Sequence, residues 1–246
     1  TTLAAERLGR FRRGASVTPR SVAVVAVSAM VVSGCMPEAA TAQAKSISQL
    51  YSLFLAAAAV VLVVVWGGAT LAIIRSRRRR DPGLPTQTRG SLPLELAWTI
   101  IPALVALGLF VATVAVLDRV DAETPTPAVQ LQVTAFRWGW RFDFAEPKVE
   151  ISGDVTDPPV LHLPVGEPIH VTITALDVDH SFYVPAFLFK RDAIPGLSTT
   201  FDLDIDTAGT YAGQCAEFCG IGHDQMTFTI VAEPVPAFQA WLAAQP

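Results

Sequence analysis

Residues 215–226 read Cys-Ala-Glu-Phe-Cys-Gly-Ile-Gly-His-Asp-Gln-Met, and this short segment holds four side chains that bind soft metal ions. They are Cys215, Cys219, His223 and Met226. Two thiolates, an imidazole and a thioether together select copper over hard cations. A blue-copper site uses one cysteine and two histidines, whereas a second cysteine four residues away suits two copper ions bridged by both sulfurs. Such a centre needs one more histidine from elsewhere in the chain.

Two cysteines at this spacing also suit a structural zinc site, or a Cys215–Cys219 disulfide formed in an oxidising compartment. A zinc site does not need Met226, however, and a disulfide needs neither the methionine nor a histidine. The residues therefore favour copper. The chain has three further histidines that can complete the site: His162, His170 and His180.

The chain from residue 129 onward has the pattern of an all-β domain. Apolar and polar residues alternate over 129–135, which is typical of a half-buried strand. The same alternation recurs, with Gly and Pro between, in three later segments: 170–176, 200–206 and 226–231. Many short strands without intervening helices predict a Greek-key β-sandwich or small barrel. A short closing helix is predicted at 234–244.

Two long apolar segments precede this domain. Residues 50–74 are uncharged and would measure about 37 Å as a helix, and residues 95–117 are apolar after Glu95. The loop between them, 75–94, contains six arginines, and short basic loops face the cytoplasm. The sequence therefore predicts a two-helix transmembrane hairpin with both flanking parts outside. A linker (118–128), the all-β domain (129–232) and a tail (233–246) follow.

The first residues have the pattern of a secretion signal. Arginines precede an apolar stretch, 22–32, that is too short to span a membrane, so we predict a signal peptide at 1–34. The tetrapeptide Val-Ser-Gly-Cys ending at Cys35 resembles a bacterial lipoprotein cleavage box. We therefore favour a lipidated Cys35 at the start of an outer segment, 35–49. The alternative is cleavage after Ala44, which lies far from the apolar stretch.

Charge is distributed unevenly along the chain. Residues 1–117 contain twelve Lys and Arg against four Asp and Glu, whereas residues 118–246 contain six against eighteen. A basic membrane part joined to an acidic domain predicts a cationic protein partner and no nucleic acid. The alternative is that the acidic surface serves solubility alone.

The copper segment and the Tyr-x-Gly-Gln before it resemble the copper loop of cytochrome c oxidase subunit II, a haem–copper oxidase family. Other segments match that family in order: Asp177–Pro185, Lys190–Gly196 and Trp98–Pro102. The resemblance covers about 45–232 and implies a cupredoxin fold with a dinuclear centre, CuA. It implies six metal ligands: His180, Cys215, Glu217, Cys219, His223 and Met226.

The resemblance also assigns a role to each ligand. Cys215 and Cys219 would bridge two copper ions, and His180 and His223 would each bind one. The backbone carbonyl of Glu217 and the weak axial thioether of the methionine complete the set. In the family this glutamate's side chain also reaches a magnesium or manganese ion at the boundary with subunit I. The remaining histidines have no motif support and are expected to be strand or surface residues.

The resemblance implies that the chain accepts electrons from cytochrome c and passes them to haem in subunit I. There oxygen is reduced to water with proton pumping. Trp138 matches the tryptophan that first receives the electron, and Glu95 matches the glutamate at the cytoplasmic mouth of a proton channel. Asp143 and Asp177 are expected to steer a cationic cytochrome. Four residues depart from the family pattern: Arg137, Gly139, Arg141 and Leu197.

The expected setting is the bacterial cell membrane, in a complex with subunit I, other oxidase subunits and lipid. A quinol oxidase subunit II would lack the copper ligands. A membrane-anchored copper carrier would have no use for Trp98, Glu95 or Trp138. A nitrous oxide reductase would carry a further histidine-rich domain. No Cys-x-x-Cys-His haem attachment is present, so haem is expected only in partner proteins.

Overall fold

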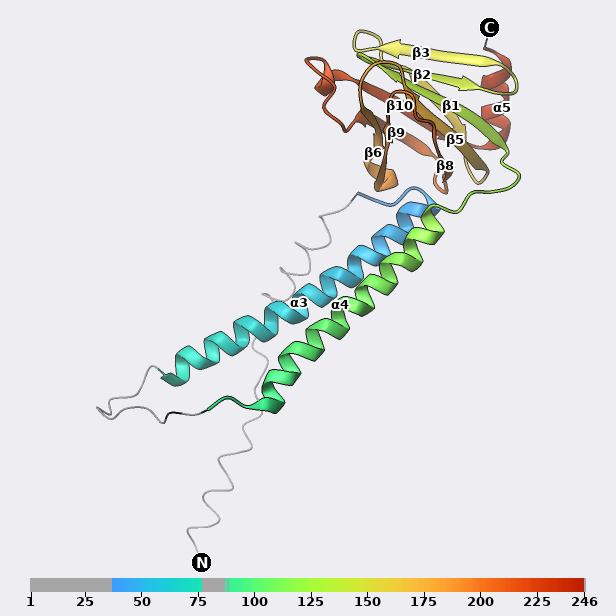
Figure 1. Cartoon of the computed structure of the whole chain (residues 1–246). Coiled ribbons are helices and arrows are strands. Elements are labelled where there is room, and N and C mark those ends of the chain that lie inside the picture. Colours follow the sequence, from blue (N-terminus) through green and yellow to red (C-terminus); the bar gives the residue numbers. More distant parts are fainter. Residues whose placement is uncertain (1–36, 77–86, 88, 246) are drawn as a thin grey trace, which may run out of the picture. The chain divides into compact units, whose positions relative to one another are not determined.

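The computed structural model describes residues 37–76, 87 and 89–245. The predicted signal peptide, Cys35 and most of the arginine-rich loop lie outside these residues. In the described part, two long helices are followed by a β-sandwich and a short helix (Figure 1).

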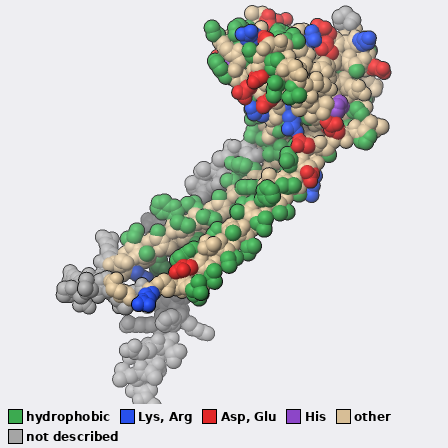
Figure 2. Space-filling model, viewed as in Figure 1, with side chains coloured by type: hydrophobic (Ala, Val, Ile, Leu, Met, Phe, Trp, Pro, Cys, Tyr) green, Lys and Arg blue, Asp and Glu red, His purple; other side chains and the backbone are tan. Residues whose placement is uncertain are grey.

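The two long helices, α3 (Ala42–Ser76) and α4 (Leu92–Val120), lie side by side and run in opposite directions (Figure 1). They contain the predicted spans 50–74 and 95–117. Apolar side chains cover both helices almost without interruption, whereas most charged side chains lie on the β-sandwich (Figure 2). Both helices are long and apolar enough to cross a membrane.

Helix α3 begins eight residues before the predicted span, because its first turn packs on the β-sandwich. Ala44 is fully buried, and the side chain of Gln43 donates to the backbone carbonyl of Asp202 (3.3 Å). The hydroxyl of Thr41 accepts from the Ala44 amide (2.9 Å), which satisfies a free N–H at the helix start. The span was predicted from its run of apolar residues. The first turn of α3 is partly polar, so the prediction placed the start of the helix too late.

Ten strands in the described residues form two five-stranded sheets. The first sheet has the order β3-β2-β1-β5-β8, with β1 Val129–Phe136, β2 Gly139–Phe144, β3 Val149–Asp154, β5 Pro168–Ala175 and β8 Thr199–Asp204. The second has the order β4-β10-β9-β6-β7, with β4 Val160–Pro164, β6 His180–Val184, β7 Phe189–Ala193, β9 Gly209–Cys215 and β10 Thr227–Glu233. Strands β1 and β5 pair in parallel, as do β4 and β10, and the other pairs are antiparallel.

The two sheets enclose one core, to which every strand contributes at least one buried residue. Trp140 and Phe142 of β2 meet Phe228 of β10 with ring centroids 5.3 and 5.6 Å apart. The short helix α5 (Val235–Ala243) adds Phe238 and Leu242 to the same core. The four strands expected from alternation are confirmed as β1, β5, β8 and β10 to within two residues.

Candidate metal centre

The cysteine-rich segment forms a loop between two neighbouring strands of the second sheet. Strand β9 ends at Cys215, a short 3-10 turn spans His223–Gln225, and β10 begins at Thr227. The Cys215 amide donates to the Met226 carbonyl (2.9 Å) and closes the base of the loop. His180 opens β6, which pairs with β9, so strand pairing brings this distant residue to the loop.

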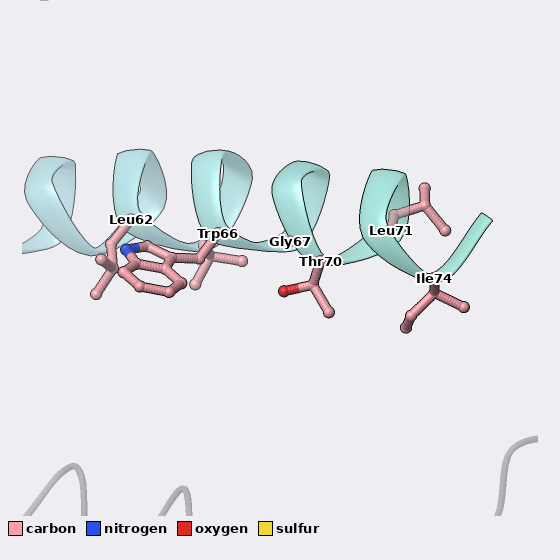
Figure 3. A pocket seen from close by; sticks show the side chains of 7 residues that line it. Leu62, Trp66, Gly67, Thr70, Leu71 and Ile74 are labelled. Carbon is pink, nitrogen blue, oxygen red and sulfur yellow. The ribbon is translucent and has the colours of Figure 1, made fainter. Parts of the chain in front are cut away.

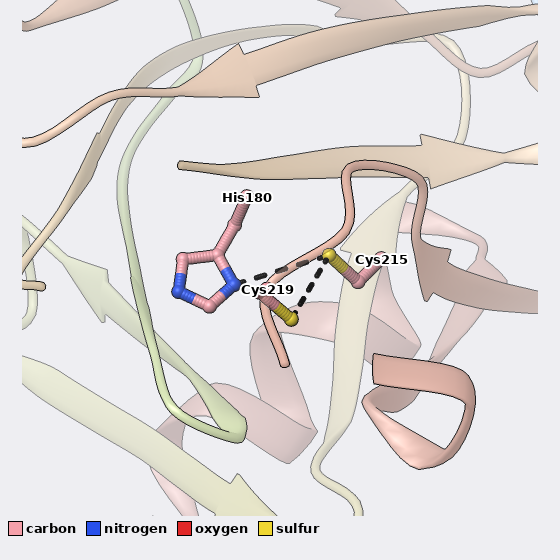
Figure 4. Close-up of side chains that lie close together, drawn as sticks. All are labelled: His180, Cys215 and Cys219. Carbon is pink, nitrogen blue, oxygen red and sulfur yellow. Dashed lines mark hydrogen bonds between the residues drawn. The ribbon is translucent and has the colours of Figure 1, made fainter. Parts of the chain in front are cut away.

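Three buried side chains form the centre of the site: His180, Cys215 and Cys219 (Figure 4). The Cys215 sulfur lies 3.9 Å from His180 Nδ1 and 3.9 Å from the Cys219 sulfur. The Cys219 sulfur lies 3.7 Å from His223 Nδ1 and 3.8 Å from the Met226 sulfur. The Glu217 carbonyl lies 3.2 Å from the Cys215 sulfur. The structure thus gathers all six predicted ligands around the two sulfurs.

This donor set fits a pair of soft metal ions. Metal–thiolate bonds are about 2.3 Å long, so two sulfurs 3.9 Å apart can both bond to the same ion. Each cysteine sulfur has one imidazole nitrogen within 3.9 Å, so a pair of ions could take one histidine each. The cysteines are free, and their sulfurs are far beyond the ~2.05 Å of a disulfide. The geometry does not fit a disulfide and is compatible with a site in which both sulfurs bind metal.

Asp177 orients the His180 ring. Its carboxylate lies 3.0 Å from His180 Nε2, which leaves Nδ1 facing Cys215. A carboxylate behind a metal-binding histidine fixes the tautomer and raises the basicity of the ligating nitrogen. The same carboxylate accepts from the backbone amides of Arg137 (2.8 Å) and Val178 (2.7 Å). Burial opposes ionisation of this carboxyl, but these hydrogen bonds outweigh it and lower the Asp177 pKa.

The two thiols respond in opposite ways to their surroundings. Burial opposes ionisation of Cys215, but hydrogen bonds with His180 and the neighbouring backbone outweigh it and lower the pKa of this thiol to about 6. Burial and the adjacent charge of Cys215 raise the pKa of Cys219 to about 12. Both thiols must be deprotonated to bind metal, so metal binding at this pair would release protons.

Trp138 lies against the copper loop. Its indole N–H donates to the backbone carbonyl of Cys219 (3.2 Å). Arg137 before it forms an ion pair with Asp177 (3.2 Å), and Arg141 after it forms one with Asp143 (3.0 Å). Two of the departures from the family pattern thus pair with the two acidic residues predicted to steer a partner.

Gly139 and Leu197 are the remaining departures from the family pattern, and the structure accounts for the first of them. Gly139 stands where strands β2 and β3 approach so closely that a side chain would collide with the Gly153 carbonyl oxygen. Leu197 is half exposed and follows a turn in which Gly196 takes a φ of +76°, with the Leu197 amide donating to the Ile194 carbonyl (3.2 Å).

Several predicted site residues lie apart from the metal centre. Glu95 is exposed in the first turn of α4, at the opposite end of this helix from the β-sandwich. The Glu217 carboxylate pairs with Lys190 Nζ (3.2 Å).

His162 and His170 lie on β4 and β5, as expected for strand residues, and are hydrogen-bonded to carboxylates of Glu233 and Asp202. The Asp177–His180 contact was not predicted, although the i, i+3 spacing before a strand was a possible signal.

Fold and site together define a membrane protein whose β-sandwich carries a two-cysteine metal centre. Residues 146–235 match the family "Cytochrome C oxidase subunit II, periplasmic domain", and residues 28–116 match "Cytochrome C oxidase subunit II, transmembrane domain". This chain belongs to the cytochrome c oxidase subunit II family. The predicted fold class, a two-helix hairpin followed by a cupredoxin-like domain, is confirmed.

Two relatives compared by sequence agree with this assignment. The "Probable cytochrome c oxidase subunit 2" of Nocardia farcinica is 30% identical over 97% of this chain and 85% of the relative. The "Cytochrome c oxidase subunit 2" of Alkalihalophilus pseudofirmus is 34% identical over 71% of this chain and 52% of the relative. A crystal structure of the periplasmic domain of subunit II of cytochrome oxidase of Bradyrhizobium japonicum is 28% identical, covers 50% of this chain and 96% of that domain, and has a TM-score of 0.46.

Family membership makes the chain a subunit of an oxidoreductase complex, cytochrome c oxidase. It is a membrane protein with an extracytoplasmic C-terminal domain. Copper binding at the cysteine loop is consistent with this family.

Proposed function

We propose that this chain is the electron-accepting subunit of its oxidase. It takes electrons from cytochrome c and passes them to haem in subunit I, where oxygen is reduced to water with proton pumping. The observation that carries this proposal is the arrangement of two imidazole nitrogens and a thioether around two sulfurs 3.9 Å apart.

In this proposal Cys215 and Cys219 would hold a pair of copper ions together with His180 and His223. Met226 and the Glu217 carbonyl would be weaker ligands. When bound, the copper pair supplies a one-electron carrier whose charge is shared between two metals and two sulfurs. The protein keeps four of these ligands out of water: His180 and both cysteines are buried, and Met226 is 1% exposed. A fixed ligand cage favours electron transfer because little has to rearrange when the charge changes.

The proposal is tested by purifying the full chain in detergent, loading it with copper, and measuring metal content and absorption. We expect two coppers per chain and a purple, mixed-valence spectrum that extends into the near infrared. The oxidised protein should gain one electron from reduced cytochrome c. One copper per chain with a single intense blue band would contradict the dinuclear site.

The Glu217 side chain is proposed to share a magnesium or manganese ion with subunit I. Its carboxylate is half exposed and pairs with Lys190, which also contacts Asp192 (3.1 Å). In the complex, the carboxylate would exchange this lysine for the ion.

The electron donor is proposed to be a cationic cytochrome attracted by the acidic outer domain. The local pairs of Asp143 with Arg141 and Asp177 with Arg137 reduce the negative charge next to Trp138. Steering therefore depends on the summed charge of the domain more than on these two residues. The association rate is expected to fall as salt is added, over a screening length of about 8–10 Å near physiological ionic strength.

The helices α3 and α4 are proposed to cross the cell membrane, with the arginine-rich loop between them in the cytoplasm. Arg75 in the last turn of α3 and Arg89 just before α4 lie at this end of the hairpin. Figure 3 shows a shallow hollow on the membrane-exposed side of α3, lined by Leu62, Trp66, Gly67, Thr70, Leu71 and Ile74. Lipid or the neighbouring subunit would cover these apolar residues in the oxidase.

Glu95 is proposed to deliver protons to a channel in subunit I. It stands at the cytoplasmic end of α4, exposed and next to residues of the loop. An ionisable residue at a membrane boundary is a candidate for proton uptake. In the assembled oxidase, Glu95→Gln should slow steady-state turnover while rapid reduction of the copper centre stays intact. Normal turnover of this variant would mean that Glu95 has no part in proton uptake and is only a carboxylate that stabilises the helix N-terminus.

The packing of residues just before α3 supports a mature chain that keeps these residues. The Ala40 amide donates to the Ala186 carbonyl (3.0 Å), the Ala40 carbonyl accepts from the Asp206 amide (2.9 Å), and Thr41 forms a β-bridge with Ile205. Cleavage after Ala44 would remove these contacts. We therefore predict that the mature chain retains them and starts at a lipidated Cys35. Intact-mass analysis should show an acyl increment on a chain beginning there, and an unmodified N-terminus at Lys45 would contradict it.

A further inference from the structure

The Trp138 ring lies directly on the backbone of two glycines in the copper loop. A Cβ atom at Gly222 would stand 2.7 Å from Cδ2 and 2.8 Å from Cγ of the Trp138 ring. A Cβ atom at Gly220 would stand 3.1 Å from Cζ2 of the same ring. Carbon atoms in favourable contact lie about 3.5–4.0 Å apart, so a side chain at either position would push the ring away.

The two glycines differ in what the backbone requires. Gly220 has a φ of +120°, a conformation that other residues rarely adopt, so glycine is needed there for the backbone as well. Gly222 has a φ of −89° and a ψ of 12°, which any residue can adopt. Glycine is therefore needed at position 222 because of the Trp138 ring, whose atoms are the three nearest to a Cβ placed there.

The backbone beside Trp138 is held in place, so a new methyl group would move the ring rather than the chain. The Arg137 amide donates to Asp177 (2.8 Å), and on the other side Gly139 begins β2, paired with both β1 and β3. The ring itself is held by its single hydrogen bond to the Cys219 carbonyl (3.2 Å). Moving the ring by about 1 Å would lengthen or break this bond.

We infer that Gly222, supported by Gly220, is a positioning residue for electron uptake: the bare backbone lets Trp138 lie on the loop and hydrogen-bond to a copper ligand. This inference rests on the proposed function, in which Trp138 receives the electron. One electron leaves the reduced donor and passes by way of Trp138 to the oxidised copper centre. The donor is thereby oxidised and the centre reduced, with no bond broken and no proton moved.

The experiment compares Gly222→Ala with the unaltered oxidase complex and with Gly209→Ala as a matched control. Gly209 lies at the other end of β9 from Cys215, and a Cβ there would come no closer than 3.3 Å, to the Tyr211 hydroxyl. Gly222→Ala should slow reduction of the copper centre by cytochrome c about tenfold or more, since ~1 Å misplacements have effects of this size. Copper content, the near-infrared spectrum and the KM for cytochrome c should not change. Gly209→Ala should behave as the unaltered complex.

A double-mutant cycle shows whether the glycine acts through the tryptophan. Trp138→Phe should slow electron uptake by itself, and adding Gly222→Ala to it should cause little further loss. If Trp138→Phe slows uptake and Gly222→Ala does not, or if the two effects multiply, the positioning role is wrong. If Trp138→Phe leaves uptake unchanged, the proposed route through Trp138 fails first, and the inference with it.

A second measurement needs no copper and no turnover. In the copper-free full chain in detergent, the indole N–H resonance of Trp138 can be assigned by its loss in Trp138→Phe. In Gly222→Ala this resonance should shift and exchange faster with solvent, because the hydrogen bond to Cys219 is lost. An unchanged resonance, or loss of copper binding in the variant, would overturn the inference and make Gly222 a structural residue of the loop.

Discussion

Replacing Cys215 or Cys219 by serine is expected to abolish the dinuclear centre. Each sulfur lies within 3.9 Å of the other and within 3.9 Å of a histidine nitrogen. In the proposed centre each sulfur therefore binds to both copper ions. A serine oxygen is a hard ligand and does not ionise near neutral pH, so it cannot bridge two soft ions. Purified full-length variants should lose the near-infrared band and at least one of the two coppers.

Met226→Leu is the matched control for the cysteine variants. The methionine is buried and lies 3.8 Å from a single sulfur, as suits a weak axial ligand. Leucine has a similar volume, so the core should be preserved. We expect both coppers to remain, with a shifted spectrum and reduction potential. A cysteine variant that kept two coppers and its spectrum would contradict the bridged arrangement.

Asp177→Asn is expected to weaken copper binding by about 10–100-fold, the range seen when a carboxylate behind a metal-binding histidine is lost. Its carboxylate lies 3.0 Å from His180 Nε2 and leaves Nδ1 facing Cys215. An amide can present its N–H₂ group instead, and the histidine ring is then free to turn. Copper affinity and the absorption spectrum of the full chain measure the effect.

Asp143→Asn separates this role from steering. Asp143 carries the same charge as Asp177 and also pairs with an arginine, Arg141 (3.0 Å). It lies near the end of β2, however, and contacts no predicted metal ligand in the described hydrogen bonds. It should leave copper affinity unchanged and alter only the association rate with cytochrome c and its salt dependence. If Asp177→Asn behaves like Asp143→Asn, with an intact spectrum, then Asp177 acts in docking and not in ligand orientation.

The sequence predicted four of the ten described strands, because their apolar and polar residues largely alternate. In β5, every second residue from Ile169 to Ala175 is buried, and that alternation could be recognised without knowledge of the partner strands. The pairing of β1 with β5, and of β6 with β9, could not be predicted in this way. Both pairings depend on contacts between residues far apart in the sequence. The pairing of β6 with β9 is the one that brings His180 to the copper loop.

The candidate site could be predicted as a set of ligands but not as an arrangement. The residue types in the loop indicated soft-metal chemistry, and resemblance to a family selected one histidine out of three. The contacts behind the ligands were missed because they join residues of unremarkable type. Asp177 looked like a surface acid, and Gly222 like a loop residue, until their neighbours in space were known.

The outer domain is attached to both helices of the pair, before α3 and after α4, at the same end of the hairpin. Before α3, Ala40 and Thr41 join the edge of the sandwich. After α4, Asp121 pairs with Arg191, Glu123 with Thr200, and the Thr124 amide with Asp202. A domain on one flexible linker would explore many orientations, and electron delivery would wait for a productive one. Two attachments restrict the orientation of the domain relative to the helices. We therefore expect the electron to pass from the outer domain toward the membrane over a fixed distance, without domain motion as the slow step.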